Sequence, residues 1–365
     1  MILYKTKNYI KRHNLNYLGF HKFIGMYLII RIHLYNNVNR PFDYGKRMCE
    51  LLFISSGFLV GYNYYEKSLE FTYQSSFKYA YKHLRNFYPF YLFNFIYGIY
   101  FYKNESKFGL TYIELILINI FMIANWSSHR RIARFYYGIS WFLDNLLYCY
   151  FLSPLLLYTI NNKLTNSLKF LFFAISARIL VEEFLNRGAY NVYDTNFHCG
   201  PIIRILEFYI GMLISPLFIY FKTYLDKLQN YISFKILFTI VQIVFPICLC
   251  YIFSIFNKIL LRCYFVLIIC IYIFIISYDY GYLSVFVSNG IIKPIMSPQM
   301  EMYLIQMNVN ITFIYFFGDK FNKSAIREFI FSIKIMIIFI VSFFYRKFIR
   351  DKFANLMDKV IFSLI

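Results

Sequence analysis

The sequence lacks most of the features by which soluble and metal-binding proteins are recognised. Its 365 residues include 38 lysines and arginines but only 18 aspartates and glutamates, and no polar stretch is long enough for a soluble domain. The seven cysteines are odd in number and form no Cys-x-x-Cys pair, which argues against a disulfide framework and a zinc site. No Gly-rich phosphate loop, metal-ligand cluster or internal repeat is visible. These absences exclude many soluble classes.

Apolar residues dominate what is present. They make up 60% of the chain, whereas a soluble domain has about 45–50%. Several windows reach the ~20 apolar residues that span a bilayer. We therefore expect an all-α fold, a polytopic transmembrane bundle of about ten spans that forms a single domain over residues 1–365. The basic residues lie mostly in short runs between apolar segments, which the positive-inside rule explains better than nucleic-acid binding.

The positions of the basic residues predict the orientation of the chain in a plasma (inner) membrane. Residues 5–12 hold four basic side chains ahead of the first apolar segment, which places the N-terminus in the cytoplasm. Eleven apolar segments are visible. A cytoplasmic C-terminus requires an even number of spans, so one segment, 111–125 or 168–181, is expected to be re-entrant or interfacial. Residues 346–365 read as an interfacial amphipathic tail.

The first apolar segment, residues 18–35, is unusual because it carries ionisable side chains. Lys22 and His33 are eleven residues apart, almost three helical turns, so they share a face about 16 Å apart along the axis. Ionisable residues inside a membrane point to function. Glu50 begins the next span, and a hairpin across a short outer loop at 36–47 would bring it level with His33. We expect His33 to act as a general base that Glu50 orients.

Six short motifs follow one another along the chain. Their residues are Lys22 and His33; Glu50, Leu52, Phe53, Ser56, Gly57 and Phe58; Lys82, Arg85, Tyr88 and Pro89; Ser140, Trp141, Phe142, Leu143 and Pro154; Pro201, Arg204, Glu207, Phe208 and Gly211; and Tyr303, Leu304 and Ile305. In this order they resemble the acyltransferase-3 family of integral membrane O-acyltransferases. Two positions depart from that pattern. Lys22 replaces an arginine and loses its planar fork, and Gln306 replaces a histidine and cannot titrate.

The resemblance implies transfer of an acyl group, commonly acetyl, from acyl-CoA to a carbohydrate hydroxyl of a cell-surface polysaccharide or glycolipid acceptor, with no metal. A sugar hydroxyl needs a general base, the role expected of His33. Lys22, Arg85 and Ser56 are the expected donor-binding residues. Lys22 would attract the phosphates or the pantetheine arm, and the Ser56 hydroxyl or a backbone N–H would stabilise charge on the thioester carbonyl. Direct transfer and an acyl-His33 intermediate both fit.

Other interpretations stay open. Lys22 also fits a side chain that snorkels to the membrane interface, and His33 fits a polar residue near a helix end. Arg204 and Glu207, three residues apart, are expected to pair on one helix face, and Glu182 is expected to lie in a solvated loop. The alternative function is a transporter or flippase for a glycolipid or polysaccharide precursor, although its usual repeated halves are not visible.

Overall fold

The computed structural model describes residues 15–34, 44–64, 72–101, 112–126, 140–160, 164–187, 200–255, 259–317 and 324–362. All regular structure within these ranges is helical, which confirms the expected all-α class. The basic residues 5–12 and most of the expected outer loop 36–47 lie outside them.

The helices follow one another along the chain without strands in the described ranges. The first half forms α1 (Asn16–Leu34), α2 (Tyr44–Tyr64), α3 (Tyr73–Leu84), α4 (Tyr88–Phe101), α5 (Tyr112–Ile120), η1 (Ala124–Trp126), α7 (Ser140–Ile160) and α8 (Leu164–Arg187). The second half forms α10 (Pro201–Leu225), α11 (Ile232–Ile255), α12 (Ile259–Ile276), α13 (Tyr282–Val287), α14 (Ile292–Met296), α15 (Gln299–Phe317), α16 (Ser324–Phe344), η3 (Tyr345–Ile349) and α17 (Arg350–Phe362).

Four helical stretches of the described chain are long and apolar enough to cross a membrane. They are Ser140–Ile160, Leu164–Glu183, Pro201–Leu225 and Glu328–Lys359. The apolar parts of α11 and α12 are shorter, at Ile232–Cys248 and Phe265–Ile276. Helix α1 is not among the four, because its ionisable side chains lower its mean hydropathy. The structure therefore indicates a possible membrane protein, with fewer clear spans than the sequence predicts.

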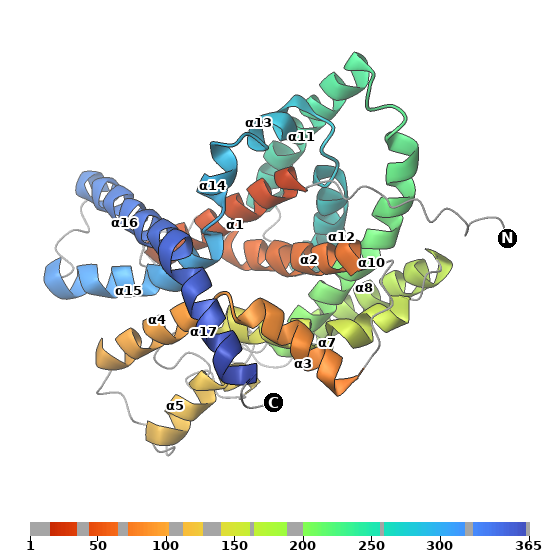
Figure 1. Ribbon diagram of the computed structural model, residues 1–365. Helices are drawn as coiled ribbons and strands as arrows, with labels where there is room; N and C mark the ends of the chain where they lie inside the picture. Colours follow the sequence, from red (N-terminus) through yellow and green to blue (C-terminus); the bar gives the residue numbers. More distant parts are fainter. Residues whose placement is uncertain are drawn as a thin grey trace.

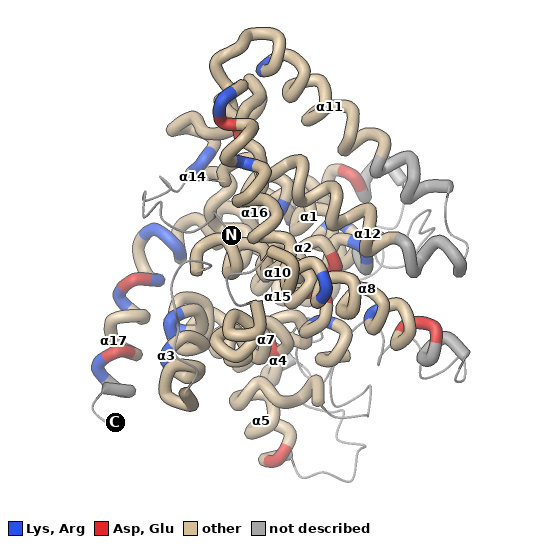
Figure 2. The backbone as a smooth tube through the Cα atoms, turned by 90° about the vertical axis from the view of Figure 1, so that its right-hand side faces the viewer, with Lys and Arg blue, Asp and Glu red and all other residues tan. Residues whose placement is uncertain are grey.

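The last candidate span is longer than a bilayer requires. Glu328–Lys359 contains 32 residues, about 48 Å of helix against a hydrocarbon core of about 30 Å. Figure 2 shows acidic and basic residues alternating along α17, whereas most of the described length of α11 carries neither. The charged end of this stretch, at the position of the expected tail, is therefore the part that a bilayer-spanning helix of this length would not need.

Helices α1 and α2 lie in the middle of the bundle (Figure 1), and α2 packs closely against α10. Two glycines make this approach possible. A Cβ on Gly57 would lie 1.8 Å from the carbonyl oxygen of Phe208, and one on Gly211 would lie 1.9 Å from that of Ile54. The Ser215 hydroxyl also donates to the carbonyl of Phe58 at 2.8 Å. Small residues therefore let the two backbones touch.

The start of α1 is held by a carboxylate from a distant part of the chain. Asp279, in the turn between α12 and α13, accepts the backbone N–H groups of Asn16 at 3.0 Å and of Tyr17 at 3.2 Å. A carboxylate at this position satisfies free N–H groups and complements the helix dipole. Burial raises the pKa of Asp279 to about 6, against the opposing effect of these two N–H groups. This cap fixes where α1 begins.

Candidate functional site

The register of the α1–α2 hairpin sets the depth of the predicted site residues. The Lys22 ammonium donates to the Ser56 hydroxyl at 3.2 Å. A Cβ on Gly25 would lie 3.5 Å from the Met48 sulfur. Since the helices are antiparallel, Glu50 lies opposite the middle of α1, about 10 Å along the axis from the level of His33. The expected match in depth between Glu50 and His33 is not found. The reason is that α2 begins at Tyr44, so Glu50 is already well inside the helix.

The Glu50 carboxylate contacts arginines instead of a histidine. Arg47 donates to its Oε1 at 2.6 Å, and Arg178 Nη2 lies 3.5 Å from the same oxygen. Glu50 is 1% exposed, and its Oε2 has no hydrogen-bond partner among the described residues. The structure therefore places Glu50 in a set of buried ion pairs.

These ion pairs join α2, α8 and α10. Arg178 also binds Glu182 and donates to Glu207 Oε1 at 3.1 Å, while Arg204 binds the other Glu207 oxygen. We name this set the buried ion-pair cluster: Arg47, Glu50, Arg178, Glu182, Arg204 and Glu207. Its three arginines balance its three glutamates. The expected Arg204–Glu207 pair is confirmed. The expectation that Glu182 is solvated is wrong, because α8 continues past it and buries it fully.

A cavity of about 340 Å³ lies beside α1. Three cationic side chains line it, Lys22, Lys293 and Arg346, together with Ser56. Apolar side chains form much of the remaining wall: Met26, Leu52, Phe142, Met296 and Met300. The cavity therefore combines positive charge with an apolar surface, which suits a ligand that has an anionic end and an uncharged arm.

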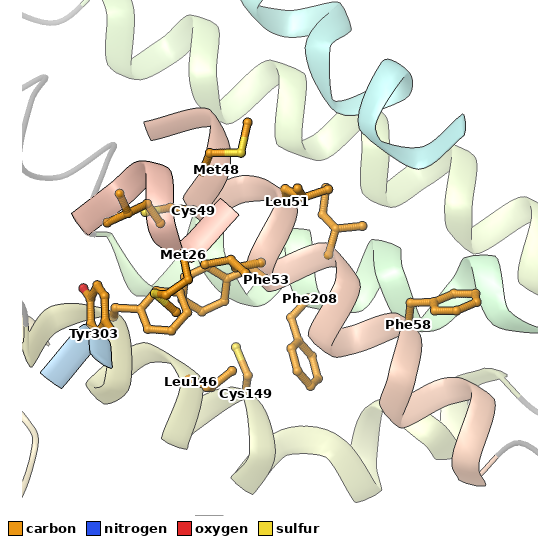
Figure 3. Close-up of a cluster of buried hydrophobic side chains, with 14 of the residues drawn as sticks. Met26, Met48, Cys49, Leu51, Phe53, Phe58, Leu146, Cys149, Phe208 and Tyr303 are labelled. Atoms are coloured by element: carbon orange, nitrogen blue, oxygen red, sulfur yellow. The ribbon is translucent and has the colours of Figure 1, made fainter. Parts of the chain in front are cut away.

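Aromatic side chains separate the cavity from the buried ion-pair cluster. The Phe53 and Phe142 rings lie 4.8 Å apart, and Phe142 lies 5.2 Å from the Tyr303 ring. The Arg204 guanidinium lies over the other side of this layer, 5.4 Å from the Phe53 centroid. Figure 3 shows Phe53 and Tyr303 within the same cluster of buried apolar side chains. The cavity and the cluster are thus neighbours with an apolar wall between them.

The structure brings together two of the predicted donor-binding residues. Lys22 and Ser56 contact each other and line the cavity. Lys22 lies about 16 Å along α1 from His33, and Ser56 of α2 is at the level of Lys22. The Ser56 hydroxyl is therefore too far away to stabilise a carbonyl that reacts beside His33. His33 is half-buried near the end of α1 and is not a lining residue.

Arg85 has a partner elsewhere. It forms an ion pair with Asp358 of α17, which also accepts the Tyr81 hydroxyl at 2.8 Å. This hydrogen bond and burial raise the pKa of Tyr81 to about 12, burial having the larger effect. Arg85 does not line the cavity, so its geometry favours attachment of the C-terminal helix over donor binding.

Sequence reasoning missed two of the cations in the cavity. Lys293 and Arg346 come from α14 and η3, far from α1 in the chain. No local spacing links them to Lys22, so a motif search had no signal for them. Gln306, at the position where the resemblance expects histidine, is fully buried, and its amide has no hydrogen-bond partner among the described residues.

Comparisons of the chain with protein-family models, with curated proteins and with solved structures return no match. The resemblance to the acyltransferase-3 family therefore rests on the motifs of this sequence and stays a prediction.

Proposed function

We propose that the protein is a membrane O-acyltransferase that moves an acyl group, acetyl in the simplest case, from acyl-CoA to a hydroxyl of a cell-surface polysaccharide or glycolipid. The cavity beside α1 is the observation that carries this proposal. It joins three cations to an apolar wall, and Lys22 and Ser56 meet inside it at 3.2 Å. An acyl-CoA has the matching chemistry, because its phosphates are anionic while its acyl thioester end is uncharged.

The proposed reaction uses both ends of the face that Lys22 and His33 share. The donor enters at the Lys22 level, and its arm extends along α1 for the about 16 Å to His33. The His33 imidazole takes the proton of the acceptor hydroxyl as the oxygen attacks the thioester carbon. The C–S bond breaks, and the thiolate leaves and takes the proton from the imidazolium. In the alternative, His33 itself is first acylated.

Glu50 has a different place in this proposal from the one that the sequence indicated. Its carboxylate is held by Arg47 and Arg178. The hairpin register places it about 10 Å along the helix axis from the level of His33. We therefore assign Glu50 to the packing of α2 against α8 and α10. His33 remains the proposed base without it.

The proposal includes a location. We place the protein in the plasma (inner) membrane as a bundle of about ten spans, with both termini in the cytoplasm. The candidate spans and the apolar surface of α11 support membrane insertion; on α11, Ile236, Ile240 and Ile247 are 48%, 52% and 63% exposed.

The test measures transfer of labelled acetyl groups. Purified protein in lipid nanodiscs receives labelled acetyl-CoA and a glycolipid extract, and mass spectrometry identifies the product. His33→Ala should lower the rate by a factor of about 10² to 10⁴, the usual contribution of a general base. Arg31→Gln is the matched control, because Arg31 lies on α1 but is exposed and on another face. Full activity of folded His33→Ala would remove the assigned base, and absence of any labelled product would remove the proposed reaction.

The alternative, a transporter or flippase for a glycolipid or polysaccharide precursor, would also use the cationic cavity. A lipid phosphate would suit the same side chains. Movement of a labelled lipid precursor across the membrane without acyl transfer would favour this second function.

A further inference from the structure

Arg346 reaches the cavity from a distorted part of the last long helix. It lies in η3, a π-helical turn over Tyr345–Ile349. Such turns are rare in proteins, but those that occur are often found at functional sites. Its Nη1 donates to the Ser297 carbonyl and lies 3.5 Å from each oxygen of Glu301. Among the described residues these contacts all use Nη1. The Nε and Nη2 edge of the guanidinium therefore remains for a ligand.

Lys293 supplies a second cation from the same side of the cavity. It is exposed on α14, four residues before Ser297, and its ammonium makes no ion pair or hydrogen bond within the described ranges. Lys22, in contrast, is bound to Ser56 and lies beside Met26 and Leu52 in the wall. The cavity thus combines two cations that can bind an anion with a wall that is in large part apolar.

We propose that Lys293 and Arg346 bind the phosphate-bearing end of the ligand, and that its uncharged arm passes Lys22 and Ser56 toward His33. An arginine edge binds two phosphate oxygens at once, and a lysine adds a point charge. The cavity is at the small end of the range for ligand sites, so it takes the arm and the adjoining phosphate of a donor as large as acyl-CoA. This inference rests on the proposed function for the identity of the ligand.

The test compares two donors that differ by their phosphates. Acetyl-CoA and S-acetylpantetheine share the thioester and much of the arm, but S-acetylpantetheine has no phosphate. Binding of each labelled compound is measured on the full-length protein in nanodiscs. We expect Lys293→Gln to weaken acetyl-CoA binding about tenfold and Lys293→Gln/Arg346→Gln about 100-fold. S-acetylpantetheine binding should change less than about twofold in both variants.

Lys347→Gln is the matched control. It removes the same charge from the same π-helical turn, but Lys347 lies over the Phe343 and Phe348 rings and does not line the cavity. We expect it to bind both donors as the wild type does. Arg346→Gln risks the fold, because it removes the partner of buried Glu301. Lys293 is exposed, so Lys293→Gln should leave the fold intact, and its effect on binding can be interpreted by itself.

The outcomes separate this inference from the proposed function. Unchanged acetyl-CoA affinity in Lys293→Gln and in the folded double variant would overturn the phosphate site even if acetyl transfer is observed. An equal loss for both donors would overturn it too, since it indicates damage to the cavity. Selective loss for acetyl-CoA without any labelled acceptor would support the phosphate site and remove the transferase.

A polyprenyl phosphate in the nanodisc is the second probe. If it binds the wild type and loses affinity in the double variant while acetyl-CoA does not bind at all, the cations recognise a lipid phosphate. That result would overturn the acyl donor as the ligand of this site. Failure of every phosphate compound to bind the wild type would overturn the site itself.

Discussion

The buried ion-pair cluster and the cavity both place charge inside the bundle, but they balance it differently. In the cluster, three arginines pair with three glutamates. Arg178 contacts all three of them, Glu50, Glu182 and Glu207. In the cavity, Lys22, Lys293 and Arg346 line the wall, and Glu301 contacts one of them.

The difference indicates what each region does. Buried charge is costly unless it is paired. The cluster meets this requirement with its own side chains, so it can hold α2, α8 and α10 together without a ligand. The cavity leaves positive charge unmatched within the described residues, which is useful in a site that receives an anion. Charge balance therefore separates a structural site from a candidate binding site.

The largest expected effect comes from breaking the cluster at its centre. Glu207 is fully buried and binds both Arg178 and Arg204. Glu207→Ala leaves two arginines buried without their shared carboxylate, so we expect the free energy of unfolding to fall by about 3–5 kcal/mol. Reversible denaturant titration of the protein in mixed micelles measures this change.

Glu328→Ala is the control for that prediction. Glu328 is exposed on α16, and its loss should change stability by less than about 0.5 kcal/mol. Similar unfolding curves for the two variants would contradict the structural role of the cluster.

A smaller effect is expected where α2 touches α10 beside the cluster. Gly57→Ala would bring a methyl group against the Phe208 carbonyl, so we expect a loss of about 1–3 kcal/mol. Gly19→Ala, in the cavity wall, meets no atom within 4 Å and should be neutral or stabilising by up to about 1 kcal/mol. Thermal unfolding of both variants compares the close-packed side of the hairpin with the open side. Equal melting temperatures would argue against the close approach of α2 and α10.

The smallest effect is expected at an ion pair outside both regions. The side chains of Arg85 and Asp358 are 37% and 24% exposed, so water and salt screen the attraction. Asp358→Asn should cost about 0–1 kcal/mol, less at high salt, and leave acetyl-CoA binding unchanged. Asp351→Asn, in a more exposed pair with Arg350, serves as the control. A clear loss of acetyl-CoA affinity in Asp358→Asn but not in Asp351→Asn would support Arg85 as a donor-binding residue after all.

Local patterns predicted more of this protein than long-range ones. Helical class and the pairing of Arg204 with Glu207 follow from residue spacing within one segment. The depth match of Glu50 with His33 failed because it depended on where α2 begins. The contact between Lys22 and Ser56 was not predicted as such, although both were chosen as donor-binding residues.

The sequence by itself determined that the chain is helical and apolar, and that Lys22 and His33 share one face of α1. These are properties of a single helix, governed by a period of 3.6 residues. Only the tertiary structure decided which charges meet. It brought Glu50 to Arg178, and Lys293 and Arg346 to the cavity that Lys22 lines. These contacts depend on helix register and on how closely distant segments approach one another. The small residues Gly57 and Gly211 allow one such approach, between α2 and α10. No spacing within a single segment specifies it.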